Sequence, residues 1–135
     1  MRLALLLIAL QAIPVLAAAD EDKVRNNYLL ACRGCHLADG SGVPPAVPSL
    51  RNTLGRFVES DEGRSYLVRV PGVLQSRLND RQLAEVINWV LTEFNAETLP
   101  ADFRRFTESE VAEWRKDILA DPGRMRDRLL TDSLQ

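Results

Sequence analysis

The stretch ACRGCHLADGSG, residues 31–42, contains the only two cysteines and the only histidine of the 135-residue chain. Cys32, Cys35 and His36 form a C-x-x-C-H pattern. A thioredoxin-like redox pair has the same cysteine spacing, but it belongs to a strand–helix–strand pattern that the flanking sequence lacks. Zinc needs three or four protein ligands, and no further cysteine or histidine completes such a set. A structural disulfide is the remaining plain alternative, and it leaves the adjacent histidine unexplained.

The same five residues form the recognised signature for covalent haem attachment. Two thiols separated by two residues can reach both vinyl groups of one porphyrin and form thioether bonds. The histidine that follows is then held beside the iron, where it can serve as the proximal ligand. The sequence therefore predicts one covalently bound haem c, anchored by Cys32 and Cys35, with His36 as the metal ligand.

The segments CRGCHLADGSGVPPAVPSLRNTLGR (32–56) and LNDRQLAEVINWVL (78–91) together resemble the class I monohaem c-type cytochromes. The resemblance covers about residues 21–95 and implies an all-α, cytochrome c-like fold around the haem. It also implies that the carbonyl of Pro48 accepts the N–H of the proximal histidine, which would orient this ligand. The matching positions outside the C-x-x-C-H motif are Gly40, Gly42, Pro48, Leu50, Gly55 and Trp89.

Residues 1–19, MRLALLLIALQAIPVLAAA, have the three-part layout of a secretory signal peptide: a basic start, an apolar run and a small-residue end. We expect cleavage after Ala19 and an exported, periplasmic protein. A retained membrane anchor is the alternative. A spanning helix needs about 20 apolar residues, whereas Gln11 and Pro14 interrupt this run.

The chain after the predicted cleavage, residues 20–135, is long enough for one small domain. It has sixteen basic residues against nineteen acidic ones, a formal net charge of −3. Such a balance provides no basic footprint for nucleic acid. No later apolar run is long enough for stable membrane insertion. We divide this part into a cytochrome c domain, residues 20–98, and a C-terminal helical extension, residues 99–135.

Within the cytochrome c domain, the patterns predict a first helix at about 21–34 and a clear amphipathic helix at 79–94. Residues 39–48 contain two glycines and three prolines, which predicts an irregular loop. In the extension, Thr107 and Glu110 form a capping-box pattern. One predicted apolar face follows this cap, and a second follows an interruption at 121–123. The two faces comprise Val111, Trp114, Ile118 and Leu119, and then Met125, Leu129 and Leu130.

The resemblance also exposes a missing iron ligand. In the familiar electron carriers of the family, a methionine shortly before the last core helix, often followed by proline, completes the iron and raises its potential. Here Val70 precedes Pro71, and the only methionines are Met1 and Met125. Three alternatives follow for the sixth position: Met125, an atypical ligand such as Tyr66 or Asn79, or a site that is open or occupied by water.

These observations favour an electron-transfer protein, not an enzyme, that exchanges single electrons with a redox protein partner. The alternative is a haem-based sensor that binds CO, NO or O₂ at an open iron site. A peroxidase-like enzyme ranks last, because it needs a distal acid–base residue and the only histidine is already used. Some distal arginines are candidates to pair with the haem propionates. They are Arg56, Arg64, Arg69 and Arg77.

Overall fold

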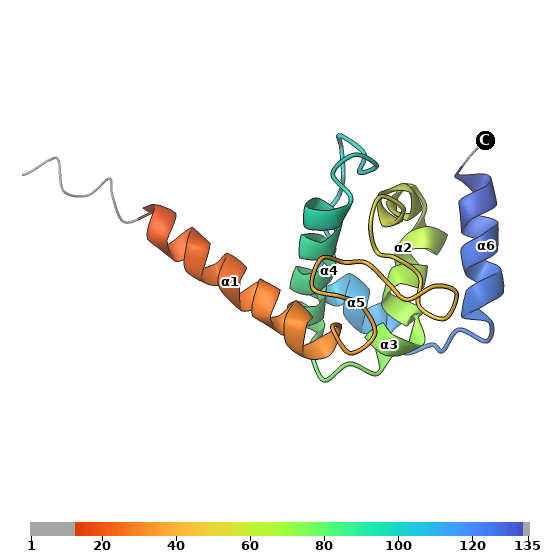
Figure 1. Ribbon diagram of the computed structural model, residues 1–135, viewed down its shortest axis with the longest axis horizontal. Coiled ribbons are helices and arrows are strands. Elements are labelled where there is room, and N and C mark those ends of the chain that lie inside the picture. The colour runs from red at the N-terminus through yellow and green to blue at the C-terminus, as the bar shows by residue number, and fades with distance from the viewer. Residues whose placement is uncertain (1–12, 134–135) are drawn as a thin grey trace, which may run out of the picture.

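The computed structural model describes residues 13–133, and its side chains from residue 20 onward. The described part is helical and contains no β-strand, only an isolated bridge between Val43 and Val47. This confirms the predicted all-α class (Figure 1). The helical elements are α1 (Ile13–Ala31), the 3₁₀ helix η1 (Leu54–Glu59), α2 (Asp61–Arg69), α3 (Pro71–Leu74), α4 (Asp80–Phe94), α5 (Glu108–Trp114) and α6 (Pro122–Asp132).

The first helix differs from its predicted bounds at both ends. Helix α1 spans Ile13–Ala31 where the pattern predicted 21–34, so the expected cleavage point after Ala19 lies inside it. The predicted signal peptide otherwise covers residues 1–12, which lie outside the described residues. After Ala31 the backbone continues in turns, because the sequence passes through the attachment motif into the glycine- and proline-rich loop.

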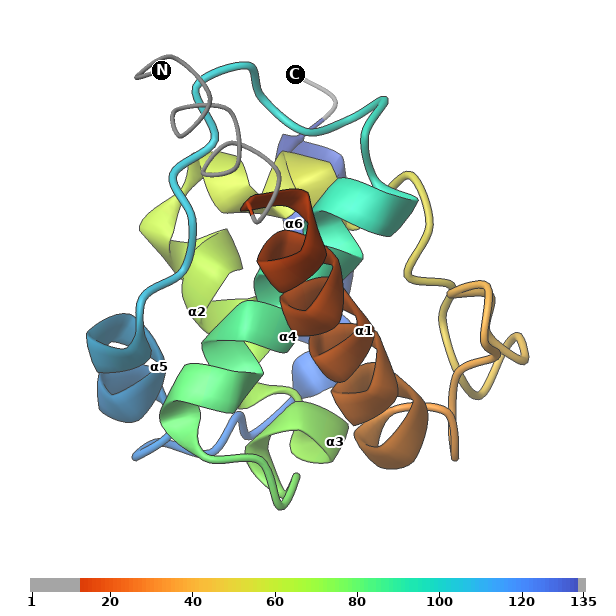
Figure 2. The same ribbon diagram turned by 90° about the vertical axis from the view of Figure 1, so that its left-hand side faces the viewer.

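Helices α1 and α4 pack against each other through aromatic rings (Figure 2). The fully buried ring of Tyr28 lies 5.2 Å from Trp89 and 5.6 Å from Phe94, measured between ring centroids. Gly40 approaches the same cluster with φ +79°, and a Cβ there would stand 2.6 Å from the Phe94 ring. Only glycine fits this approach, which draws the loop after the attachment motif onto the core.

Helix α4 confirms the clearest sequence prediction. Its N-cap is Asn79, whose side chain accepts from the backbone N–H of Gln82, while the Gln82 side chain accepts from the N–H of Asn79. This reciprocal capping box fixes where α4 begins. The helix then buries one wide apolar face, as its spacing predicts. The buried residues are Leu83, Ala84, Val86, Ile87, Asn88, Trp89, Val90, Leu91 and Phe94.

Helix α2 was not predicted from the sequence. Ser60 caps it by accepting from the N–H of Gly63, and Asp61 and Glu62 occupy its first turn, where acidic side chains favour the helix dipole. Its middle carries Arg64, which is almost completely buried. A buried arginine interrupts the apolar pattern, which explains why periodicity alone did not reveal this helix.

The C-terminal extension packs on the cytochrome core, with α5 against α4 and α6 against α2. The side chain of Asn88 in α4 donates to the carbonyl of Phe106 at 2.9 Å and accepts its N–H at 2.7 Å. The predicted capping box of Thr107 is present. The predicted apolar face is wrong at Ile118, because α5 ends at Trp114 and Ile118 is 76% exposed.

The side chain of Arg64 links this extension to α2. Its guanidinium donates to the carbonyl of Arg104 at 2.7 Å and to the carboxylate of Glu110 at 3.0 Å. It also lies 4.0 Å over the ring of Phe106. The partners of Arg64 thus come from the extension, and its candidacy as a partner of the haem propionates is wrong. A buried ion pair of this kind links two segments more than 40 residues apart.

Candidate haem-attachment site

The attachment motif lies directly after the last turn of α1. The N–H of Cys32 donates to the carbonyl of Tyr28 at 2.8 Å, and the Cys32 carbonyl accepts from Cys35 at 3.1 Å and His36 at 3.0 Å. This tight turn brings the three motif residues together at one end of the helix. Both thiols are free, with Cys32 half-buried and Cys35 exposed. Burial, followed by the neighbouring Cys35, raises the pKa of Cys32 to about 11.

The imidazole of His36 is half-buried in the same turn. Burial lowers its pKa, and the backbone of Pro48 acts in the opposite direction. Pro48 therefore lies near the ring, yet Nδ1 is buried without a hydrogen bond of regular geometry. The Pro48 carbonyl as the acceptor for His36 therefore stays a prediction. The free thiols and a half-buried imidazole in one turn nevertheless fit a covalently attached haem.

Tyr28 holds the backbone of the residue that follows His36. Its hydroxyl donates to the carbonyl of Leu37 at 2.7 Å. Burial raises the pKa of Tyr28 to about 12, with smaller contributions from Cys32 and Asp39. The phenol is therefore a neutral donor at ordinary pH. The first turn after the motif is thus fixed to the aromatic cluster between α1 and α4.

Asn95 holds the backbone that follows Pro48, a role that the sequence analysis missed. This side chain is fully buried at the end of α4. Its Oδ1 accepts from the N–H groups of Thr53 at 3.0 Å and Leu54 at 2.9 Å. Its Nδ2 donates to the carbonyls of Leu50 at 2.9 Å and Val90 at 3.2 Å. The available signal was an asparagine directly after the apolar face of a helix.

The candidates for the sixth iron ligand lie on other elements. Tyr66 is buried in α2, edge-on to Phe57, and burial is the largest cause that raises its pKa. Met125 in α6 is partly buried against the hydrophobic core. Since α6 packs on α2, these two candidates belong to the same side of the fold. Val70, in the position where a methionine was expected, begins the short connection through α3.

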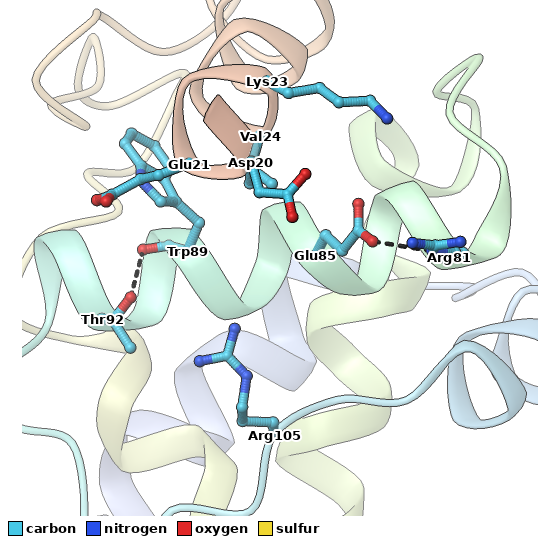
Figure 3. A pocket seen from close by; sticks show the side chains of 9 residues that line it. All are labelled: Asp20, Glu21, Lys23, Val24, Arg81, Glu85, Trp89, Thr92 and Arg105. Carbon is cyan, nitrogen blue, oxygen red and sulfur yellow. Dashed lines mark hydrogen bonds and ion pairs between the residues drawn. The ribbon is translucent and has the colours of Figure 1, made fainter. Parts of the chain in front are cut away.

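A groove lies between α1 and α4. It is lined by charges of both signs, among them Asp20, Lys23, Glu85 and Arg105, with Trp89 on its wall (Figure 3). None of the attachment residues lines it.

Trp89 was expected to cover either the porphyrin or a helix, and it packs against Tyr28 of α1. Within residues 13–133, no cluster of three metal-ligating side chains supports the zinc alternative.

An all-α fold that presents C-x-x-C-H at the end of its first helix has the features of a c-type cytochrome. The chain is 29% identical to a cytochrome c-552 of Thermus thermophilus, over 84% of this chain and 86% of the relative. It is also 29% identical to a second cytochrome c-552 of Thermus thermophilus, over 72% and 88% of the two chains. No family model matches the chain. The two relatives confirm the resemblance to the c-type cytochromes, while the class I assignment stays a prediction.

Proposed function

We propose that this chain is an exported class I cytochrome that carries one haem c and transfers single electrons between redox partners. Cys32 and Cys35 would hold the haem through thioether bonds, His36 would ligate its iron, and Pro48 would orient the imidazole. The observation that carries the proposal is the turn after α1, where two free thiols adjoin a half-buried imidazole. When bound, haem supplies a one-electron couple between Fe(III) and Fe(II).

Two buried side chains hold the backbone around the candidate site, which suits a carrier whose haem stays in one position. Tyr28 fixes the backbone immediately after His36, and Asn95 fixes the backbone that follows Pro48. These hydrogen bonds restrict the backbone that adjoins His36 and Pro48. The relatives, both named as cytochromes, support electron transfer in place of catalysis.

The export proposal rests on residues 1–19, and the periplasm is the proposed compartment. No helix among the described residues is long and apolar enough to cross a membrane. The partner is a redox protein that accepts or donates one electron. The formal charge of −3 after cleavage gives no electrostatic basis for nucleic acid as a partner.

The test is production of the full chain with haem-attachment machinery, followed by intact mass and visible spectra. The wild-type chain is expected to gain the mass of one haem. Cys32→Ala and Cys35→Ala are each expected to lose one thioether bond, and the double variant is expected to lose all covalent haem. Arg33→Ala, which changes an exposed residue between the cysteines, is the matched control and is expected to retain it. A wild-type chain that matures with both thiols unmodified would contradict the proposal.

His36 is tested separately, because it binds iron without holding the porphyrin covalently. His36→Ala is expected to keep both thioether bonds and to lose the spectral features of imidazole ligation. Restoration of these features by added imidazole would support the assigned role. An unchanged spectrum in His36→Ala would contradict it.

A second candidate is a sensor that binds CO, NO or O₂ at an open iron site. The observation that favours it is Val70 before Pro71, combined with the location of Met125 on α6. Fast CO binding by the reduced protein would favour the sensor, whereas a six-coordinate carrier resists CO. Turnover of peroxide would instead favour the peroxidase-like enzyme.

A further inference from the structure

One arginine of the C-terminal extension contacts the chain that links α2 to α4. Arg115 follows the last residue of α5, and its side chain is only 19% exposed. Its guanidinium donates four hydrogen bonds to a segment that lies 35–41 positions earlier in the sequence. The acceptors are the carbonyls of Leu78 at 2.9 Å, Ser76 at 3.0 Å and Leu74 at 3.3 Å, and the carboxylate of Asp80 at 2.8 Å.

We call residues 70–79 the connecting segment. A further hydrogen bond holds the residue that precedes this segment. The Nε of Arg69 donates to the carbonyl of Asp117 at 3.1 Å. Two residues of the extension, Arg115 and Asp117, thus contact the chain on both sides of α3. Attachment at two ends restricts a segment far more than attachment at one.

The connecting segment has little structure of its own to keep it in place. Its helix α3 has four residues, fewer than an isolated helix needs in water. Val70, Val73 and Leu78 are half-buried against the core and supply some apolar packing. Helix α2 also contacts α3. The extension adds the hydrogen bonds of Arg115 and Asp117.

The connecting segment that Arg115 holds lies near the haem-attachment motif. Figures 1 and 2 both show α3 beside the carboxyl end of α1, where the attachment motif follows. The extension therefore reaches, through one side chain, a segment that neighbours the candidate haem site.

Arginine suits this task in a way that lysine does not. The planar guanidinium presents donors along two edges and can serve several acceptors at once, whereas an ammonium group is a compact point charge. A donor that carries charge also forms stronger hydrogen bonds to carbonyl and carboxylate oxygens. Removal of Arg115 leaves three backbone carbonyls and one carboxylate without this partner.

We propose that Arg115 is a positioning residue, which holds the connecting segment beside the haem-attachment site and so restricts access of small external ligands to the bound haem. This role rests on the proposed function, since it concerns the haem that Cys32 and Cys35 attach. It also gives the extension a specific task in the cytochrome.

The test compares the haem-loaded full chain with Arg115→Ala, Arg115→Lys and Arg104→Ala. Arg104→Ala is the matched control, because Arg104 also belongs to the extension and forms ion pairs with Glu110 and Asp61, outside residues 70–79. Amide hydrogen exchange of residues 70–79 is measured first. Loss of these bonds in Arg115→Ala is expected to speed exchange there by about tenfold or more. The exchange rate in Arg115→Lys is expected to lie between those of Arg115→Ala and the wild type. Arg104→Ala is expected to exchange at the wild-type rate.

The second readout is the rate of CO association with the reduced protein, together with the visible spectrum. Arg115→Ala is expected to bind CO several times faster than Arg104→Ala, with the same covalent haem content. Equal exchange and equal CO rates in these two variants would overturn the positioning role and leave the proposed function intact. If Arg115→Ala does not fold, Arg115→Lys decides by the same two readouts, and wild-type behaviour there overturns the role. A wild-type chain without haem would instead contradict the proposed function.

Discussion

Two stretches with little regular structure lie near the carboxyl end of α1, and different parts of the chain hold them. The attachment loop, residues 32–54, is supported by Tyr28 and Asn95 from within the cytochrome domain. The connecting segment, residues 70–79, is held by Arg115 from the C-terminal extension. The first carries a motif that is legible in the sequence, and the second carries none. The comparison teaches that the attachment motif is encoded by neighbouring residues, whereas the support of the connecting segment depends on residues far away in the sequence.

The largest expected effect concerns the attachment loop. Asn95→Ala removes four hydrogen bonds from a fully buried position and leaves two N–H groups and two carbonyls without this partner. We expect the free energy of unfolding to fall by about 4 kcal/mol. Urea unfolding at neutral pH measures this change. Asn26→Ala, an exposed change on α1, is the control and is expected to stay within about 0.5 kcal/mol of the wild type.

A loss near 1 kcal/mol in Asn95→Ala, about the value of a single hydrogen bond, would contradict the assigned support. It would mean that the loop between Leu50 and Leu54 is held mainly by packing, and the contrast with the connecting segment would weaken.

The second prediction concerns the ion pair that joins the extension to α2. Glu110→Gln leaves the buried guanidinium of Arg64 without its carboxylate at 3.0 Å. We expect a loss of about 3 kcal/mol at neutral pH, because removal of one partner strands a buried charge. Thermal or urea unfolding measures it. Glu113→Gln, on the exposed pair with Lys116, is the control and is expected to have little effect.

This ion pair also sets a pH dependence. Burial of Glu110 tends to raise its pKa, but the N–H of Thr107 and the guanidinium groups of Arg104 and Arg64 outweigh it and hold the pKa below the usual range. A lowered carboxyl pKa contributes stability above the unfolded-state pKa, and this is lost as the pH falls through the folded-state value. The gap between the wild type and Glu110→Gln is therefore expected to narrow in acid. A constant gap across this range would contradict the assignment.

The smallest expected effect tests the support that Tyr28 gives to the attachment loop. Tyr28→Phe removes only the hydroxyl that donates to Leu37 at 2.7 Å and keeps the ring contacts with Trp89 and Phe94. We expect a loss of about 1 kcal/mol in unfolding free energy. Tyr66→Phe is the matched control, because no hydrogen bond of its hydroxyl occurs within the described residues, and it is expected to lose less. Equal losses in both variants would remove Tyr28 from the support of the loop.

Sequence reasoning reached the features that depend on local patterns. The motif at Cys32, the capped helix α4 and the short helix α6 after Asp121 all follow from spacing and caps. Helix α2 was not predicted because Arg64 interrupts its buried face. The burial of Arg64 depends on the carboxylate of Glu110, 46 positions later.

The same reason hid the roles of Asn95 and Arg115. Each is a polar side chain whose partners are mostly backbone groups of a remote segment, and backbone groups leave no mark in the sequence. Ile118 was misplaced because periodicity does not show where a helix such as α5 ends. Pairing across long distances is fixed only by the folded chain.

The most direct test of the central claim is an optical redox titration of the haem-loaded, full-length chain. The account predicts one reversible transition between ferric and ferrous spectra, with one electron per chain and a slope of about 59 mV for each tenfold change in the ratio of the two forms. His36→Ala is expected to shift this transition. A chain that binds no haem, or whose haem cannot be oxidised and reduced reversibly, would contradict the account.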